Sequence, residues 1–155
     1  MVKKKVAQST QVINKQARRD YDLIKTYHAG LVLTGAEVKS LRQGHGQLRG
    51  AFINIKDGEV WLFNAMINPT TANKTVLTET MQTRMRKLLL SRKEIVELTS
   101  AKEQNLSIVP VKILTGGRFI KIEIATAKGL KKFDKREKIK KRDTERDNAR
   151  TALLK

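Results

Sequence analysis

The alternation of hydrophobic and polar positions predicts a β-hairpin around Asp57 and Gly58. A turn of these two residues lets the flanking segments pair in an antiparallel ladder. Aliphatic side chains then share one face of the hairpin, and aromatic side chains share the other. The expected pairs are Lys56 with Glu59, Ile55 with Val60, Ile53 with Leu62 and Phe52 with Phe63.

A second hairpin is predicted around Gly116 and Gly117, and its pairing gathers six aliphatic residues on one face. In this register Lys112 faces Lys121, a mildly unfavourable pair of like charges. Pro110 indicates an edge strand or a bulge, because proline has no N–H to donate to a neighbouring strand. The aliphatic residues set against each other are Ile113, Val111 and Val109 on one strand and Ile120, Ile122 and Ile124 on the other.

Helices and a further strand are predicted around these hairpins. Two capping boxes, Thr34-Gly35-Ala36-Glu37 and Ser91-Arg92-Lys93-Glu94, each begin a helix. The second of these helices is expected to bury Ile95 and Leu98. The other expected elements are a short basic helix at residues 14–21, a strand at residues 23–33 and a polar loop at residues 68–82.

This set of elements predicts a mainly β fold with flanking helices. Antiparallel hairpins with helices at their ends are typical of a small closed antiparallel β-barrel, for which the oligonucleotide-binding (OB) barrel is the natural candidate. Residues 1–128 are expected to form this RNA-binding body, including a basic N-terminal arm with Lys3, Lys4 and Lys5.

Residues 129–155 are expected to form a separate basic tail. They hold 11 Lys and Arg against 5 Asp and Glu, a net charge of +6, and their few hydrophobic residues form no stripe. Pairs such as Asp134 with Lys138 are compatible with a helix. We therefore expect a tail that is disordered when free and helical on RNA; a tail that only aids solubility is the alternative.

The whole chain is strongly basic. Its 155 residues include 33 Lys and Arg against 15 Asp and Glu, a formal net charge of +18. Such a charge opposes compact folding unless a large anionic partner neutralises it, and nucleic acid is the expected partner. The sequence has neither an apolar run of transmembrane length nor a signal peptide, so we expect a cytoplasmic protein without a membrane partner.

The composition leaves few residues for catalysis or metal binding. There is no cysteine, and the two histidines are His28 and His45, which excludes thiolate chemistry and the usual zinc sites. The glycine-rich residues 44–50 lack the spacing of a nucleotide-binding loop and are interpreted as an ordinary loop. We therefore expect no enzyme, no metal, no cofactor and no small-molecule substrate.

Three basic clusters are candidates for binding RNA phosphates. The middle cluster also contains Leu88-Leu89-Leu90, of which one leucine either stays exposed to pack on an unpaired base or is buried with the others. Trp61 is expected to pack in the core more readily than to stack on RNA. The clusters are Lys15 to Arg19, then Arg84, Arg86 and Lys87, and finally Lys128 to Arg142. Their candidate contacts are Lys15, Arg18, Arg84, Arg86, Lys87, Lys128, Lys131 and Lys132.

The helix that follows Thr34 adds three further candidates for RNA binding. Lys39 and Arg42 are three residues apart and therefore neighbours on its surface, and Glu37 lies on the same helix. A helix cap and two solvated charges would explain the same residues without any function.

Taken together, several motifs closely resemble small protein B (SmpB), the tmRNA-binding protein family of bacteria. The resemblance covers nearly the whole chain, and the order and spacing of the motifs make it specific. The motifs are Asn14-Lys15-Gln16-Ala17-Arg18, Ala29-Gly30-Leu31, residues 35–44 (GAEVKSLRQG), Arg86-Lys87-Leu88-Leu89-Leu90 and residues 128–136 (KGLKKFDKR).

The resemblance implies a body that binds the tRNA-like domain of tmRNA and accompanies it into the empty A site of a stalled ribosome. The tail would fold in the vacant mRNA channel, at the decoding centre of the small ribosomal subunit RNA. Trans-translation then tags the nascent peptide and releases the ribosome. By motif match, Asn14, Lys15, Arg86, Lys87 and Leu89 are implied tmRNA contacts, and Asp134, Lys135 and Arg136 are implied contacts of the decoding region.

Two positions depart from the family pattern. His28 stands where the family usually has glutamate, and a histidine there can stack on a base or donate to a phosphate. Phe133 stands where histidine is common, which preserves stacking in the decoding region but removes hydrogen-bond donation.

The charge and the tail alone would also suit a ribosomal protein or a general RNA chaperone with an OB barrel. Only the family motifs separate these alternatives. An RNA-modifying enzyme would need a cofactor pocket or a catalytic constellation, and we find neither in the sequence.

Overall fold

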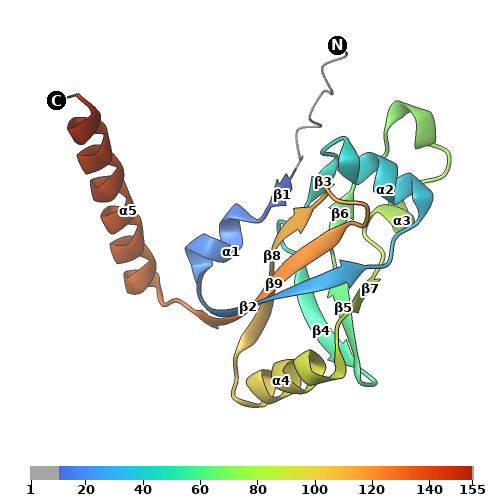
Figure 1. Ribbon diagram of the computed structural model, residues 1–155, viewed down its shortest axis with the longest axis horizontal. Helices are drawn as coiled ribbons and strands as arrows, with labels where there is room; N and C mark the ends of the chain where they lie inside the picture. The colour runs from blue at the N-terminus through green and yellow to red at the C-terminus, as the bar shows by residue number, and fades with distance from the viewer. Residues whose placement is uncertain (1–10, 155) are drawn as a thin grey trace, which may run out of the picture.

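The fold is built on a curled antiparallel sheet of seven strands (Figure 1). The computed structural model describes residues 11–154, so the predicted arm with Lys3, Lys4 and Lys5 lies outside the described residues. A mainly β fold with helices is therefore confirmed. Across the sheet the order is β1 (Gln11–Ile13), β8 (Ser107–Leu114), β9 (Lys121–Gly129), β2 (Tyr21–Leu31), β7 (Arg86–Leu89), β5 (Glu59–Phe63) and β4 (Phe52–Lys56), and a separate two-stranded sheet pairs β3 (Gly46–Gln47) with β6 (Met66–Ile67).

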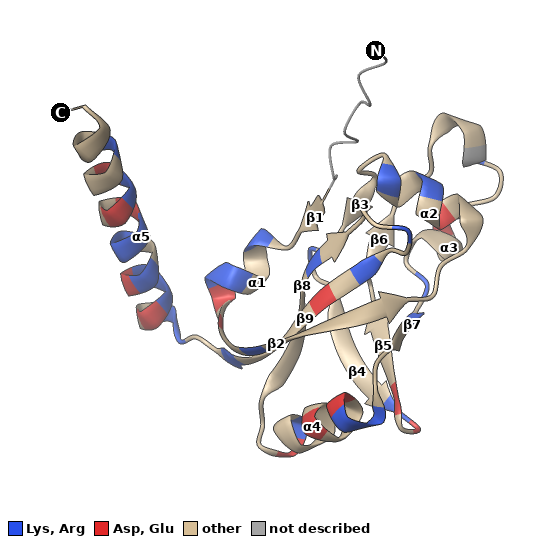
Figure 2. Ribbon diagram, in the orientation of Figure 1, with Lys and Arg blue, Asp and Glu red and all other residues tan. Residues whose placement is uncertain are grey.

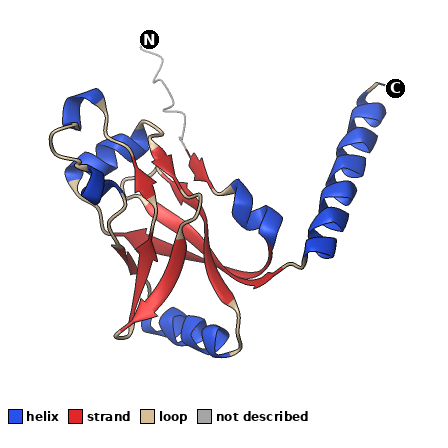
Figure 3. Cartoon of the chain, turned by 180° about the vertical axis from the view of Figure 1, so that it is seen from behind, coloured by secondary structure: helices blue, strands red, loops and turns tan. Residues whose placement is uncertain are grey.

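The expected closure of the sheet into a barrel is wrong. β1 and β4 are the ends of the strand order, and within residues 11–154 no ladder joins β4 to β1 or to β8. β4 nevertheless lies close to β8, because the sheet curls around its core (Figure 3). An open seam remains between these two strands, and the pairing does not establish an OB barrel.

The first predicted hairpin is confirmed in every pair. β4 and β5 pair in the expected register from Phe52 with Phe63 to Lys56 with Glu59. Asp57 and Gly58 both have positive φ, 53° and 72°, as the two-residue turn of a tight hairpin requires. The rings of Phe52 and Phe63 stack with their centroids 5.2 Å apart.

The second predicted hairpin exists, but its register is wrong. β8 and β9 pair with Ile113 opposite Ile122 and Lys112 opposite Glu123, and residues 115–120 form a longer loop than the predicted turn. The Nζ of Lys112 lies 3.1 Å from the Glu123 carboxylate, so an attractive pair replaces the expected repulsion with Lys121. A bulge between Pro110 and Lys112 confirms one of the two alternatives for the proline.

Both capping boxes form as predicted. The Glu37 carboxylate accepts from the Thr34 N–H at 2.9 Å, and the Glu94 carboxylate accepts from the Ser91 N–H at 2.8 Å. Among the described residues, no helix is both long enough and apolar enough to span a membrane. The helices are α1 (Lys15–Asp20), α2 (Gly35–Arg42), the short 3-10 helix η1 (Thr71–Asn73), α3 (Glu79–Gln82), α4 (Arg92–Glu103) and α5 (Lys132–Leu153).

Alternate residues of the strands divide the sheet into a core face and an outer face. On β2, Tyr27 and Ala29 are buried, whereas His28 between them is exposed. We call the solvent side of the sheet the outer face. As predicted, Leu98 of α4 is fully buried, and Ile95 packs partly against the core. The largest aliphatic side chains of the core are Leu41, Leu48, Leu62, Ile67, Leu98, Ile113, Ile122 and Ile124.

α5 projects from the body (Figures 1 and 3). It begins at Lys132, close after the end of β9 at Gly129, and buries none of its residues. The helical form is the one expected for the tail on RNA. α5 buries no residue against the body. Its expected disorder in the free chain stays a prediction.

Candidate nucleic-acid interface

The outer face of β9, β2 and β7 brings together residues that are far apart in the sequence. Gly30 of β2 pairs with Lys121 on one side and with Leu89 on the other. These three residues form a row across the sheet, which we call the outer-face row. His28, two residues earlier on β2, is exposed on the same face and pairs with Glu123.

Leu89 is exposed, which is the first of the two alternatives that the sequence left open for the run of leucines. It exposes 55% of its surface, whereas Leu88, next to it on β7, exposes 2%. A Cβ added at Gly30 would lie 3.2 Å from the Leu89 Cβ, so the glycine leaves room for the leucine side chain. An exposed aliphatic group beside a lysine offers a surface on which an unpaired base can pack.

Glu37 and Arg86 were both predicted as RNA contacts, but they are buried, and this prediction is wrong. Each has a relative exposure of 0%. The Glu37 carboxylate accepts from the Nε of Arg84 at 2.9 Å and from the Nε of Arg86 at 3.0 Å. Arg84 also donates from its Nη2 to the second carboxylate oxygen at 2.7 Å. The three side chains form a buried ion cluster from which only Arg84 reaches solvent.

Arg86 uses its other donors to hold the backbone that surrounds it. Its Nη1 donates to the carbonyl oxygen of Ala65 at 2.7 Å, and its Nη2 donates to those of Met81 at 3.1 Å and Gln82 at 3.0 Å. Arg86 therefore ties β7 to α3 and to the residue that precedes β6. It supports the interface from within and does not touch a ligand on the surface.

The Glu37 carboxyl keeps its charge inside the protein. Burial alone would raise its pKa, but hydrogen bonds from Arg84 and the Thr34 backbone, with the charge of Arg86, outweigh burial and lower the pKa of Glu37 below its ordinary value. Burial lowers the pKa of Arg86 despite the opposing effect of Glu37. Glu37 and Arg86 are thus opposite charges buried together, and removing either one would leave the other charge buried without its partner.

Arg42 of α2 holds the loop between β8 and β9. Its Nη2 donates to the carbonyl oxygens of Gly117 at 3.3 Å and Arg118 at 3.0 Å. The guanidinium of Arg118 lies 5.4 Å from the centroid of the Phe119 ring. Lys39 is exposed on the same helix, as its role in RNA binding would require.

Asn14 is a structural residue and not an exposed contact, which corrects a further prediction. It exposes 7% of its surface, its Oδ1 accepts from the Ala17 N–H at 3.2 Å, and its Nδ2 donates to the Pro110 carbonyl oxygen at 2.9 Å. Asn14 therefore caps α1 and fastens it to β8. Lys15 and Arg18 of α1 are exposed.

Lys87 lies on the outer face next to Trp61, its partner in the ladder of β7 with β5. It forms an ion pair with Glu59. The expected core position of Trp61 is wrong: the ring is half-buried on the outer face, while its neighbours Val60 and Leu62 fill the core.

Lys and Arg residues recur along α1 and α5, as the ribbon in Figure 2 shows, and polar contacts join the two helices. The Nζ of Lys135 lies 3.6 Å from the Asp20 carboxylate, and the Nζ of Lys138 donates to the Tyr21 carbonyl oxygen at 3.2 Å. Further along α5, the Nη2 of Arg142 donates to the Arg18 carbonyl oxygen at 3.3 Å.

The tail residues predicted to contact the decoding region lie at the start of α5. Phe133 exposes 73% of its surface, and Asp134 and Arg136 are exposed, whereas Lys135 is half-buried against the body. The three predicted RNA contacts of this region, Lys128, Lys131 and Lys132, are exposed.

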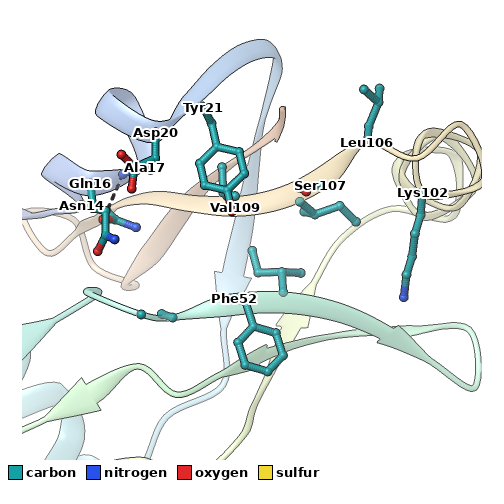
Figure 4. Close-up of a pocket in the computed structure, with 14 residues that line it drawn as sticks. Asn14, Gln16, Ala17, Asp20, Tyr21, Phe52, Lys102, Leu106, Ser107 and Val109 are labelled. Atoms are coloured by element: carbon teal, nitrogen blue, oxygen red, sulfur yellow. Dashed lines mark hydrogen bonds between the residues drawn. The ribbon is translucent and has the colours of Figure 1, made fainter. Parts of the chain in front are cut away.

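A cavity of about 410 Å³ lies at the open seam between β4 and β8 (Figure 4). Phe52 of β4 and Val109 of β8 line it, together with Asp20 and Tyr21 at the end of α1. None of the predicted contact residues except the capping Asn14 lines this cavity. It lies where β4 and β8 are not hydrogen-bonded, and it shares no residue with the outer-face row.

Arg118, Phe119 and Lys121 are further candidates, which the sequence pattern did not predict. They lie beside Gly30 and Leu89 and line one groove with them. An exposed aromatic residue between two basic ones, next to a glycine pair, was a usable signal. The predicted register hid this signal, because it put Ile120 in the ladder and Lys121 opposite Lys112.

Comparison with known proteins gives a consistent result. The family model described as SmpB protein matches residues 11–153. The SsrA-binding protein of a Synechococcus strain is 46% identical over 140 residues, covering 89% of this chain and 90% of the relative. The SsrA-binding protein of Gloeobacter violaceus is 43% identical over 137 residues, with 88% and 89% of the two chains covered.

Longer coverage and a solved structure agree with these matches. The SsrA-binding protein of Coxiella burnetii is 43% identical over 150 residues, covering 96% of this chain and 94% of the relative. A chain of the structure described as "tmRNA-SmpB: a journey to the center of the bacterial ribosome" is 38% identical, with a TM-score of 0.66. That alignment covers 80% of this chain and 87% of the other.

Proposed function

This chain belongs to the SmpB family, and from that membership we propose that it binds tmRNA and acts with it in trans-translation on stalled bacterial ribosomes. Its relatives are named for binding SsrA, and the similar solved chain comes from a tmRNA–SmpB ribosome complex. The family separates this function from that of a ribosomal protein or a general RNA chaperone. We assign it no catalytic step and place its work in the cytoplasm.

The outer-face row is the observation that supports tmRNA binding most directly. It places an exposed aliphatic side chain, Leu89, and the cation of Lys121 in one row. Phosphate neutralisation and base packing are the two terms from which RNA affinity is built. We also propose that the side chains of Lys15, Arg18, His28, Lys39, Arg84, Lys87, Lys128, Lys131 and Lys132 contact the tRNA-like domain.

Four other predicted residues support this surface through contacts within the protein: three are buried, and Arg42 is exposed with its Nη2 bonded to the loop between β8 and β9. Asn14 caps α1, Arg42 holds a loop, and Glu37 and Arg86 form the buried ion cluster. Their loss would therefore weaken RNA binding through the shape of the body.

We propose that the tail acts separately from the body, at the decoding centre and in the mRNA channel of the small subunit. Phe133, Asp134, Lys135 and Arg136 are the residues assigned to this contact. The first turn of α5 leaves the Phe133 ring exposed, so it can stack on a ribosomal base.

Binding to three RNAs tests the proposal: the isolated tRNA-like domain of tmRNA, an ordinary tRNA and an unrelated hairpin, each at two salt concentrations. We expect the tRNA-like domain to bind most tightly, and its affinity to fall steeply with salt because several phosphate contacts release counterions. Equal affinity for all three RNAs would contradict tmRNA recognition. Affinity that salt leaves unchanged would contradict the basic surface.

A further inference from the structure

A groove of about 400 Å³ lies beside the outer-face row. Leu33 and Val38 line it with Ile120, which gives it an aliphatic floor. Two of its lining residues are exposed hydrophobic side chains: Leu89 and Phe119, the latter with 70% of its surface exposed. An aromatic ring this exposed is available to pack on a ligand in the groove.

The charges around the groove favour an anionic partner. Arg42, Arg118 and Lys121 all line it, and none of the residues that line it is acidic. An apolar floor with a cationic rim matches a nucleotide, whose base is a flat apolar surface and whose phosphate is an anion.

The pairing state of that nucleotide follows from the shape of the site. Bases in a paired helix are stacked inside it and present no free face to a groove. A nucleotide from a loop or bulge can turn out of its stack and offer its base to an aromatic side chain.

The groove is also held in shape before a ligand arrives. Arg42 donates to the carbonyl oxygens of Gly117 and Arg118, which fixes the loop that carries Phe119. A site that is already ordered loses less conformational entropy on binding.

We propose that this groove holds one unpaired nucleotide of the bound RNA, with its base packed between Phe119 and Leu89 and its phosphate near Arg118 and Lys121. The inference deepens the proposed function and rests on it, since it takes the tRNA-like domain of tmRNA as the source of the nucleotide. It assigns to Phe119 a direct part in recognition.

Affinity of the full chain for the tRNA-like domain gives the first test. Phe119→Ala should weaken binding about tenfold, the order expected when one base–aromatic stack is removed, and Phe119→Tyr should keep most of the affinity. Phe52→Ala is the matched control, because it removes a ring that is 50% exposed outside the groove and should leave affinity unchanged. Thermal melting of each variant confirms that it is folded.

A fluorescent reporter gives the second test, which does not depend on the stability of Phe119→Ala. The chain has one tryptophan, so the double variant Phe119→Trp with Trp61→Phe places the only indole in the groove. The tRNA-like domain should quench its emission by stacking, and a fully paired RNA duplex should not.

The two levels of the hypothesis fail in different ways. Wild-type affinity of Phe119→Ala, or emission that the tRNA-like domain leaves unchanged, would overturn the groove site while tmRNA binding stands. Equal quenching by the duplex would overturn the assignment of an unpaired nucleotide. If the unsubstituted chain prefers no RNA, the proposed function itself is wrong.

Discussion

Leu88 and Leu89 are adjacent on β7 but point to opposite faces of the sheet, so their substitution should have opposite effects. Leu89→Ala should weaken binding to the tRNA-like domain while changing the free energy of unfolding by less than about 0.5 kcal/mol, as for other exposed positions. Leu88→Ala should cost about 2–5 kcal/mol, because it opens a cavity in the core. Denaturant unfolding and filter binding measure the two quantities. A strongly destabilising Leu89→Ala would place that side chain in the core instead.

Glu37 should carry more stability than its place in a capping box suggests. Glu37→Gln leaves the charge of Arg86 buried without its carboxylate, which typically costs about 3–5 kcal/mol. The melting temperature should then fall by roughly 10 °C. Glu94→Gln is the matched control, because Glu94 holds the same capping-box position on α4 without a buried ion pair, and it should cost no more than about 1 kcal/mol. Similar melting temperatures for the two variants would contradict the buried cluster.

The lowered pKa of Glu37 adds a pH dependence to the same pair. A carboxyl whose pKa is lower in the folded chain than in the unfolded chain stabilises the fold. This stabilisation is fully present at pH values above the ordinary pKa of 4.5. That stability is lost as the pH falls through the lowered pKa. Acid titration should therefore destabilise the unsubstituted chain more than Glu37→Gln, which has no proton to take up at that position.

Single residues show where sequence reasoning succeeds and where it stops. Exposure of one leucine in a run of three was a fair expectation, because neighbours on a strand face opposite sides. The burial of Arg86 could not be seen in the same way. It lies among other basic residues, and the carboxylate that neutralises it, on Glu37, is 49 positions away in the chain.

The two hairpins show the same limit at the scale of elements. Asp57-Gly58 forms a two-residue turn, which fixes the register of β4 against β5. Residues 115–120 form a longer loop, which does not determine the register. With the bulge between Pro110 and Lys112, β8 pairs Lys112 with Glu123 instead of Lys121. The prediction of barrel closure was wrong for a similar reason, because no local sequence pattern shows whether β4 will form hydrogen bonds with β8.

α5 should depend on its surroundings for its structure. It carries nine Lys and Arg against five Asp and Glu, a net charge of +4, and buries no residue. We therefore expect the circular dichroism of the full chain, minus that of a chain ending at Leu130, to show little helix in low salt without RNA. The difference should become helical when RNA is added. A full helical signal in the free chain would contradict this expectation.

For the whole molecule, binding and ribosome rescue should be separable at the end of β9. A chain ending at Leu130 should keep its melting temperature within a few degrees, because the ion pairs that join α5 to the body are partly exposed to solvent and stabilise it by about 0–1 kcal/mol each. It should still bind the tRNA-like domain, yet fail to support peptide tagging on stalled ribosomes in a translation assay. Full tagging by the shortened chain would rule out the proposed role of the tail.

A substitution within the tail refines that test without removing a segment. Phe133→Ala should lose much of the tagging activity and Phe133→Tyr should keep most of it, since a base–aromatic stack is worth about 1–3 kcal/mol. Neither should change affinity for the isolated tRNA-like domain. Wild-type tagging by Phe133→Ala would contradict the stacking role of Phe133. It would not contradict the requirement for the tail that the shortened chain tests.

Two carboxylates of the body form ion pairs with lysines of α5 that we propose bind RNA phosphates. Asp20 lies 3.6 Å from the Nζ of Lys135, and Asp22 lies 3.8 Å from that of Lys138. An RNA backbone carries many phosphates, whereas the body offers two carboxylates here. We therefore expect RNA to compete with Asp20 and Asp22 for the same lysines. On the proposed role of the tail, RNA phosphates would replace these two carboxylates as partners of Lys135 and Lys138. Raising salt should mimic this competition, so a distance probe between α1 and α5 should report their separation well before the core unfolds.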